Sequence, residues 1–454
     1  MKNRFFAALF SVVAPVILAL TACGGRSAGS SDSVTISFWH SAANEAGAAI
    51  DRITDGFNAG PGKEKGITVE AIFQGQNADA AVKLNTVLQS DMAEDLPDIM
   101  QIDATGIVSY MNSEYAFTVD DAVAKYPGYD LGRFLPAPLM MWNFGGRQLG
   151  FPITLTTSVM YYNKTILDAA GITEPPTTFA GIIDAARRLP KTNPNGQPLT
   201  AYAQIPNTPL LANWIGQIPG KDGAGSSYVV DNRNGRDGIA ARLVCDTEGT
   251  LELFLNAWKE LYDAGAVANV SDSLNDLFLT QQTVFLTANT SQLAGLLAQA
   301  GGRFELACTY YPRINDKMNF GASVSGSGIF MFNKGADRRT GAAWEFVQYV
   351  LSPSVQAELS AATGYFPGVK AAFEDPVYLE NVEKFPQFKV GSDQLSKTSS
   401  DMLNVTVGPS RDFYMEIMNQ VSTMLTGNIE PSQAAKTMAD SLNAVLAEYS
   451  RSNP

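Results

Sequence analysis

The chain carries one histidine, His40, and this limits the acid–base and metal chemistry that the sequence supports. Transition-metal sites in proteins rest on clusters of histidine and cysteine, so a centre with several histidines is excluded. A Ser/His/Asp nucleophilic centre would have to use His40 as its base. Because His40 directly follows a short apolar run and stands beside Trp39, it is typical of a structural or cavity-lining histidine. The sequence therefore predicts neither a metal site nor a cofactor, and no histidine-dependent catalysis.

A glycine- and serine-rich segment, residues 323–328, has the composition of a phosphate-binding loop. Such a loop needs a following helix whose N-terminus faces the anion, whereas the apolar run from Ile329 to Phe332 continues as a strand. The chain has no Walker A sequence, no GxSxG elbow between a strand and a helix, and no GxGxxG that follows a strand. A carboxylate pair for glycoside hydrolysis stays open as an alternative, because such partners meet in space and not in sequence.

The N-terminal residues have the order of a secretion signal. Lys2 and Arg4 precede an uncharged, largely apolar run over residues 5–20, which is too short and wrongly flanked for a membrane span. We therefore interpret residues 1–22 as a signal peptide. The four residues that end at Cys23 (Leu-Thr-Ala-Cys) resemble the bacterial lipobox, which implies lipidation of Cys23 and a stable membrane anchor. Residues 23–33 then form a lipid-anchored flexible tether.

The composition of the remaining chain bounds its partners and its compartment. The net charge is −13 without a basic cluster, which excludes nucleic-acid binding. No later segment approaches the roughly 20 consecutive apolar residues of a membrane helix, so only the lipid anchor would hold the protein at a membrane. Cys245 and Cys308 either pair, as an oxidising compartment permits, or remain buried thiols.

The predicted elements alternate in a way that specifies an α/β fold. Strands are expected over 34–38, 67–73 and 99–102, with helices over 46–57 and 79–88 between them. This order is typical of a mostly parallel sheet. Later strands and helices are expected over 159–162, 179–189 (with Thr178 as N-cap), 254–261, 283–286, 329–332, 344–351, 413–425 and 431–445.

Five short motifs in a fixed order resemble the extracellular solute-binding proteins of ABC importers, and among these the glycerol-3-phosphate-binding branch. The resemblance covers nearly the whole chain after the signal peptide. The motifs are Phe38-Trp39-His40-Ser41, Tyr161-Tyr162-Asn163-Lys164, Pro175-Pro176-Thr177-Thr178-Phe179, Thr363-Gly364-Tyr365-Phe366-Pro367, and Leu425-Thr426-Gly427 with Glu430-Pro431.

The resemblance implies a periplasmic-binding-protein-like fold, in which two α/β lobes close around a ligand in the cleft between them. We expect residues 34–144 and 289–352 to form lobe 1, and residues 145–288 and 353–454 to form lobe 2. The expected protein is a monomer and not an enzyme. It would capture a small polar solute outside the cytoplasm and deliver it to the permease subunits of an ABC importer.

Ligand contacts of the glycerol-phosphate branch carry over to some positions of this chain. Gly326 and Tyr365 match the family in identity, and Thr156 and Asn289 keep its polarity. Asn77 stands where the family has a tyrosine.

Two further positions depart from the family. A family glutamate falls at Ala104, beside Asp103, which itself ends a predicted strand where it either lines the cleft or caps the next helix. The arginine that would hold the phosphate aligns with Thr406, and Arg411 follows five residues later.

This missing arginine favours a neutral carbohydrate over a phosphate ester, because the planar guanidinium fork suits oxyanions. Asp103, Asn77, Asn289 and Thr156 would match sugar hydroxyls. Tyr365 would offer an aromatic face together with Trp214 or Trp39, although the position of Trp214 suits core packing equally well. Glycerol 3-phosphate and its diesters remain the alternative ligands, and an anchored glycoside hydrolase remains the alternative of another class.

Overall fold

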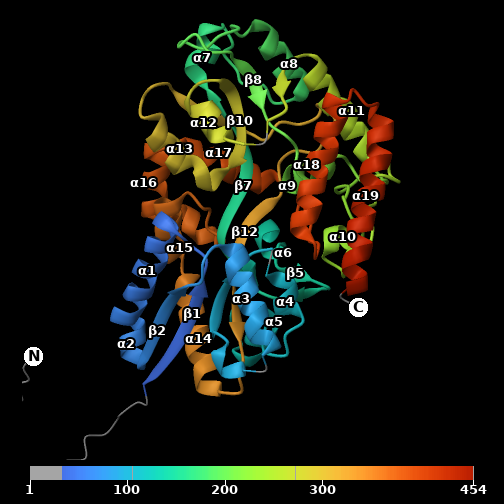
Figure 1. Cartoon of the computed structure of the whole chain (residues 1–454). Coiled ribbons are helices and arrows are strands. Elements are labelled where there is room, and N and C mark those ends of the chain that lie inside the picture. Colours follow the sequence, from blue (N-terminus) through green and yellow to red (C-terminus); the bar gives the residue numbers. More distant parts are fainter. Residues whose placement is uncertain (1–32, 91, 105, 271, 453–454) are drawn as a thin grey trace, which may run out of the picture.

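The computed structural model describes residues 33–452, apart from residues 91, 105 and 271. The expected signal peptide, Cys23 and most of the tether lie outside the described residues. The described chain forms two halves, one above the other, with the first strands in the lower half and the middle of the chain in the upper half (Figure 1). The last two helices run along one side of the molecule.

The lower half is built on a sheet that begins with three parallel strands. The strands β1 (Val34–His40), β2 (Ile67–Phe73) and β3 (Ile99–Ile102) pair in parallel in the order β2-β1-β3, and β12 (Val324–Phe332) joins β3 in antiparallel fashion. The short β4 (Ala116–Phe117) pairs with β12. Its helices are α1 (Asn44–Ala59), α2 (Pro61–Lys65), α3 (Asn77–Gln89), α4 (Ile107–Met111), α5 (Val119–Lys125), α6 (Pro136–Met140), α14 (Asp337–Val350) and α15 (Pro353–Thr363).

The upper half is built on β10 (Thr283–Asn289), which pairs in parallel with β8 (Thr200–Ala203), and β8 pairs in parallel with β9 (Val267–Ala268). Its helices before β12 are α7 (Lys164–Ala169), α8 (Phe179–Arg188), α9 (Thr208–Gln217), α10 (Asp231–Gly235), α11 (Thr250–Asp263), α12 (Leu274–Leu279) and α13 (Leu293–Ala300). The C-terminal helices are α16 (Pro376–Lys384), α17 (Gln387–Lys397), α18 (Ser410–Thr426) and α19 (Pro431–Ser452).

One long strand, β7 (Phe151–Asn163), joins the two halves. Residues 151–157 pair with β12 in the lower half, and residues 158–162 pair with β10 in the upper half. The strand β11 (Leu306–Thr309) also pairs with the upper part of β7. The partner of β7 therefore changes between Thr157 and Ser158, in the centre of the molecule (Figure 1).

The lobe boundaries expected from the sequence stay a prediction, and the strand pairing favours shifting them. The first part of β7 and helix α15, which packs on α1, belong with the lower half, although both were expected in lobe 2. Helix α13 and β11 lie in the upper half, although they were expected in lobe 1. At the first of these boundaries, Gly145 lies in the turn of a local hairpin formed by β5 (Asn143–Phe144) and β6 (Arg147–Gln148).

Apolar side chains form separate cores in the two halves. The lower core includes Phe38 and Phe57, whose rings lie 5.6 and 5.1 Å from Phe346 of α14. The upper core includes Trp258, which is fully buried. Each half therefore has an apolar interior of its own.

Most elements expected from the sequence are confirmed. The helix over 179–189 forms as α8, and Thr178 Oγ1 accepts a hydrogen bond of 3.2 Å from Gly181 N as its N-cap. Strand β7 is much longer than the expected 159–162. In its lower part the apolar Ile153 and Leu155 alternate with Thr154 and Thr156, and the burial of these threonines depends on contacts with other strands.

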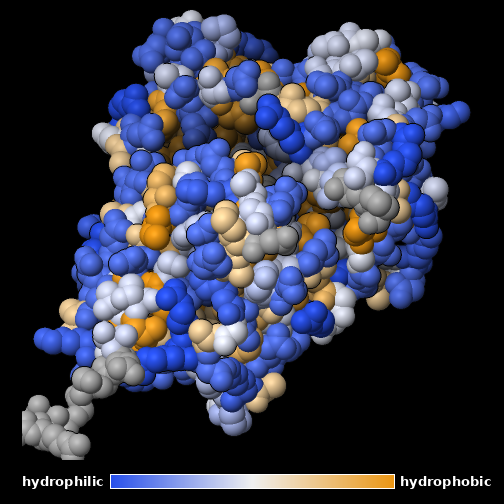
Figure 2. Space-filling view, turned by 60° about the horizontal axis from the view of Figure 1, so that its bottom comes forward, coloured by the Kyte–Doolittle hydropathy of each residue, from blue (hydrophilic) through white to orange (hydrophobic). Residues whose placement is uncertain are grey.

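The two later cysteines are free thiols. Cys245 is buried, and burial raises the pKa of Cys308 to about 12, so both thiols stay protonated at neutral pH. Within the described part of the chain, no helix combines the length and the apolar character needed to cross a bilayer. Hydrophilic colours dominate the face in Figure 2, where apolar side chains form only small groups.

Candidate functional site

A cavity of about 560 Å³ lies between the two halves, where β7 and β12 pair. This size suits a small polar molecule. Most of the polar side chains around it are uncharged hydroxyls and amides: Ser41, Asn44, Gln76, Asn77, Gln101, Thr154, Thr156, Thr208, Asn289, Ser291, Ser325, Ser327, Tyr365 and Asn404. Asp103 and Arg236 are the charged residues among the described lining, and Trp142 and Tyr365 are its aromatic residues.

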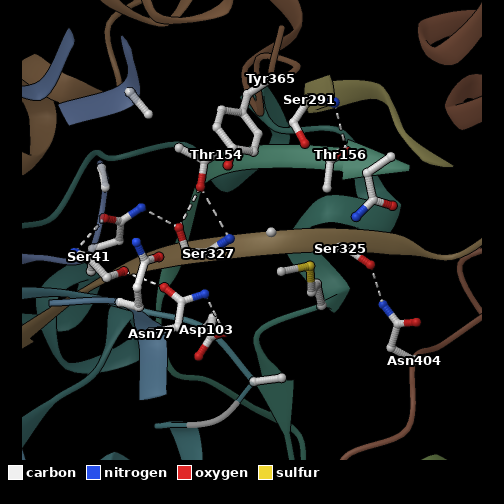
Figure 3. A pocket seen from close by; sticks show the side chains of 18 of the residues that line it. Ser41, Asn77, Asp103, Thr154, Thr156, Ser291, Ser325, Ser327, Tyr365 and Asn404 are labelled. Carbon is white, nitrogen blue, oxygen red and sulfur yellow. Dashed lines mark hydrogen bonds between the residues drawn. The ribbon is translucent and has the colours of Figure 1, made fainter. Parts of the chain in front are cut away.

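The lower wall is a hydrogen-bonded network at the carboxyl ends of β1 and β3. Ser41, which follows β1, donates to Asn77 at the first turn of α3, and Asn77 Nδ2 donates to Asp103 Oδ2 at 2.7 Å (Figure 3). Gln101 Oε1 accepts from Ser41 N at 3.3 Å. Parallel strands end at one edge of their sheet, so these residues meet although they are far apart in sequence.

The floor is the antiparallel pair β7–β12. Gln101 Nε2 donates to Ser327 Oγ at 2.6 Å, and Ser327 also bonds to Thr154 across the pair (Figure 3). Gly326 has φ of 130° and lies so close to the Thr154 carbonyl that a Cβ atom would overlap it. The absence of a side chain at Gly326 therefore allows the two strands to approach this closely.

The upper wall comes from the end of β10, from the turn after it and from Asn404. Thr156 Oγ1 bonds to Thr290 Oγ1 at 3.0 Å and accepts from Ser291 N at 3.3 Å. Asn289 Oδ1 accepts from Ser158 Oγ at 3.1 Å. Asn404 Nδ2 donates to Ser325 Oγ at 2.8 Å, which ties the segment before α18 to the floor (Figure 3).

Tyr365 projects toward the cavity from the turn after α15 (Figure 3). Gly364 ends that helix with φ of 77°, a left-handed conformation that allows the chain to turn toward β7. Burial raises the pKa of the Tyr365 phenol, and a hydrogen bond with the Ser291 side chain lowers it by less. The phenol is therefore neutral at physiological pH and able both to donate and to accept a hydrogen bond.

The structure brings together six of the eight residues predicted as ligand contacts. Tyr365, Gly326, Asn289, Thr156, Asp103 and Asn77 all line the cavity. Their contact with a ligand stays a prediction.

The other two predicted contacts lie elsewhere. Trp214 is fully buried in the upper core, where its Nε1 donates to the Pro312 carbonyl at 3.1 Å, so core packing is the correct interpretation. All residues of α9 from 210 to 217 are buried. Arg411 is exposed on the first turn of α18, outside the described lining. Trp39 also belongs to a core cluster.

Several lining residues were missed from the sequence. Ser41 carried a usable signal, because it directly follows a strand that was predicted correctly. Ser325 and Ser327 alternate around Gly326, a period that places both on one face of β12. Gln101, Arg236 and Asn404 carried no signal, since their position depends on tertiary contacts.

Comparison with known proteins supports this arrangement. A family model described as bacterial extracellular solute-binding protein matches residues 53–387, which is most of the chain. The chain belongs to this family. Solved structures with a similar fold include the sugar-binding protein MalE from Xanthomonas citri (TM-score 0.73, 18% identity, 92% of this chain and 98% of that one). UgpB from Mycobacterium tuberculosis, solved in complex with glycerophosphocholine, has a TM-score of 0.72 at 22% identity, covering 92% and 99% of the two chains.

Curated relatives of this solute-binding protein are similarly distant. The sn-glycerol-3-phosphate-binding periplasmic protein UgpB of Escherichia coli K12 is 24% identical over 92% of this chain and 94% of its own length. The corresponding protein of Rhizobium meliloti is 23% identical over 91% and 94%. The expected two-lobed α/β fold is confirmed.

Proposed function

We propose that this solute-binding protein is a lipid-anchored receptor that captures a carbohydrate between its lobes and delivers it to the permease of an ABC importer. The observation that carries this proposal is the cavity lined by hydroxyl and amide groups from both halves. Such groups match the alternating donors and acceptors of sugar hydroxyls, and Tyr365 offers a ring face. Contacts from both halves are what a ligand needs in order to shift an open–closed equilibrium.

A second candidate ligand class, sn-glycerol 3-phosphate or its diesters, is supported by the names of the relatives. The same receptor role would apply. The position of the expected phosphate-binding arginine is occupied by Thr406, which is buried outside the described lining and donates its N–H to Asn234 O at 2.9 Å. An anion in the cavity would therefore need another cation.

A glycoside hydrolase is the less favoured function. Hydrolysis by the common mechanism needs two carboxyl groups on either side of the scissile bond. Among the described lining residues Asp103 is the one carboxylate, and it already accepts a hydrogen bond from Asn77. The described residues also contain no group of three or more His, Cys, Asp or Glu that could hold a metal ion.

A thermal-shift screen of the chain from Ser33 onward tests the proposal, with mono- and oligosaccharides, glycerol 3-phosphate and its diesters as probes. A ligand at 100 times its Kd stabilises the folded state by about 2.7 kcal/mol, which raises the melting temperature. Small-angle scattering should show a smaller radius of gyration with the same ligand. Chemical turnover of the bound solute would refute the receptor function.

The anchor is tested separately. We expect the full-length chain to sediment with membranes and the Cys23→Ser variant to be released, because acylation of Cys23 would be lost. Sedimentation of the variant with membranes would contradict lipid anchoring.

A further inference from the structure

Arg236 is a buried cation in the lining of the cavity. Only 4% of its surface is exposed, and its Nη1 donates to the Met141 carbonyl at 2.8 Å. Its Nε is buried with no hydrogen-bond partner, and no described carboxylate lies within 4.0 Å of the guanidinium. The neighbouring Trp142 also lines the cavity, and its Nε1 is a second buried donor with no acceptor among the described residues.

The chain before Arg236 holds an unusual conformation. Asn232, Arg233 and Asn234 have φ of 52°, 52° and 56°, and Gly235 follows with φ of 80°. Arg233 costs about 1–2 kcal/mol in this left-handed region, whereas the two asparagines adopt it more readily because their short polar side chains can form local hydrogen bonds. Such strain persists only where the surrounding structure fixes it.

Hydrogen bonds of the Asn234 side chain hold the loop in this conformation. Asn234 Oδ1 accepts hydrogen bonds from Val229 N and Val230 N at 2.8 and 3.1 Å, and its Nδ2 donates to Leu403 O at 2.8 Å. Val229 and Val230 belong to the core of the upper half. The loop therefore carries Arg236 as a rigid extension of the upper half.

The tip of this loop contacts the lower half. Arg236 O accepts from Gly145 N at 2.8 Å, and the guanidinium carbon lies 4.6 Å from the centre of the Phe144 ring. Phe144 and Met141 belong to a core cluster of the lower half. The loop that carries Arg236 is thus held to the upper half by Asn234, while Arg236 itself makes its contacts with the lower half.

Burying a charge without a counter-charge is costly, and proteins usually pair it. Elsewhere in this chain a buried charge is paired: the buried Asp98 forms an ion pair with Arg339, and one of its carboxylate oxygens lies 3.8 Å from Lys334 Nζ. A single carbonyl and one aromatic face compensate Arg236 only in part. A ligand that carries an anionic group would complete its coordination.

We propose that Arg236 binds an oxyanion of the captured solute, a carboxylate or a phosphate, while the hydroxyl and amide groups hold the uncharged body. The substrate class is then an acidic sugar or a phosphorylated polyol and not a neutral sugar. This inference rests on the proposed receptor function and narrows its ligand.

Titration calorimetry with matched pairs of probes tests the role of Arg236. The pairs are galacturonate and galactose, glucose 1-phosphate and glucose, and sn-glycerol 3-phosphate and glycerol. We expect at least one acidic member to bind at least 10-fold more tightly than its neutral partner. A bond from a charged donor contributes enough that Arg236→Gln should weaken the acidic member about 10- to 100-fold and leave the neutral member nearly unchanged.

Two further variants complete the experiment. Arg236→Lys keeps the charge and should keep a reduced preference for the acidic member. Unchanged binding of the neutral member by Arg236→Gln shows that this variant is folded. Arg233→Gln is the matched control, because Arg233 lies in the same loop with 36% of its side chain exposed and pairs with Asp237 and Asp401. It should bind every probe as the unmodified protein does.

The outcomes separate the two proposals. Equal or tighter binding of the neutral members, or equal weakening of both members in Arg236→Gln, would overturn the role of Arg236 and leave the receptor function standing. Binding of no probe, without compaction in scattering, would overturn the receptor function itself.

Discussion

Replacing Gly326 by alanine should destabilise the protein strongly, because this glycine lies where β12 and β7 approach most closely. An added Cβ would overlap the Thr154 carbonyl oxygen and would stand 2.8 Å from its carbon, whereas ordinary contact begins at 3.4 Å. At the pair formed by Gly326 and Leu155, the two strands would have to part by more than the roughly 0.6 Å that the carbonyl carbon alone requires, because the oxygen lies closer still.

The magnitude follows from two contributions. A side chain at φ of 130° costs about 1–3 kcal/mol in backbone strain. Weakening the two or so backbone hydrogen bonds around this pair costs about 0.5–1.5 kcal/mol each. We expect a total loss of roughly 2–6 kcal/mol, which is a large part of the 5–15 kcal/mol that typically stabilises a folded protein.

Urea unfolding followed by tryptophan fluorescence measures this loss. The matched control is Gly302→Ala, because Gly302 also has a positive φ, of 74°, but a Cβ there would meet nothing within 4 Å. The control should lose only the conformational cost of about 1–2 kcal/mol. Equal stability of the two variants would refute the argument that close approach of the strands requires Gly326.

Three further predictions concern single side chains. Tyr365→Ala should weaken binding of the best ligand from the thermal-shift screen, and unchanged affinity in calorimetry would remove Tyr365 from the site. Trp214→Phe should lower stability in urea through loss of the bond to Pro312 O while the affinity of the folded protein stays the same; a selective loss of affinity would return Trp214 to the cleft. His40 is buried, and burial lowers its pKa below 6.5, so the unfolded chain binds a proton before the folded one as the pH falls. Stability should therefore decrease below about pH 6.5, by at most about 1.4 kcal/mol per pH unit from this group, and His40→Gln should lose that component.

The fold could be predicted from the sequence where buried strands are short apolar runs followed by helices with an apolar face. The lower part of β7 could not, because Thr154, Thr156 and Thr157 are polar residues whose burial depends on partners in β12 and in the turn after β10. The expected lobe boundary at residue 145 stays a prediction. Gly145 and Gly146, both with positive φ, form the turn of the β5–β6 hairpin, and this turn depends on local backbone geometry.

Some residues of the candidate site could likewise be predicted from the sequence, and others could not. Asp103 and Asn77 lie at a strand end and at a helix start, positions that sequence patterns reveal. Arg236 lies after three left-handed residues that no propensity indicates, since only their contacts with the rest of the chain stabilise that conformation. Trp214 was predicted as a possible ligand contact but is buried on α9, because composition alone does not distinguish a buried helix from a loop at a cleft.

The continuity of β7 has a consequence for how this protein can vary in length. Thr154 and Thr156 point to the cavity while Ile153 and Leu155 point into apolar cores, so the strand has a fixed odd–even phase. One inserted or deleted residue below Thr157 would exchange the cavity-facing and core-facing side chains, and the floor of the cavity would become apolar. Viable insertions and deletions in β7 should therefore come in pairs of residues, or else be absorbed by a bulge.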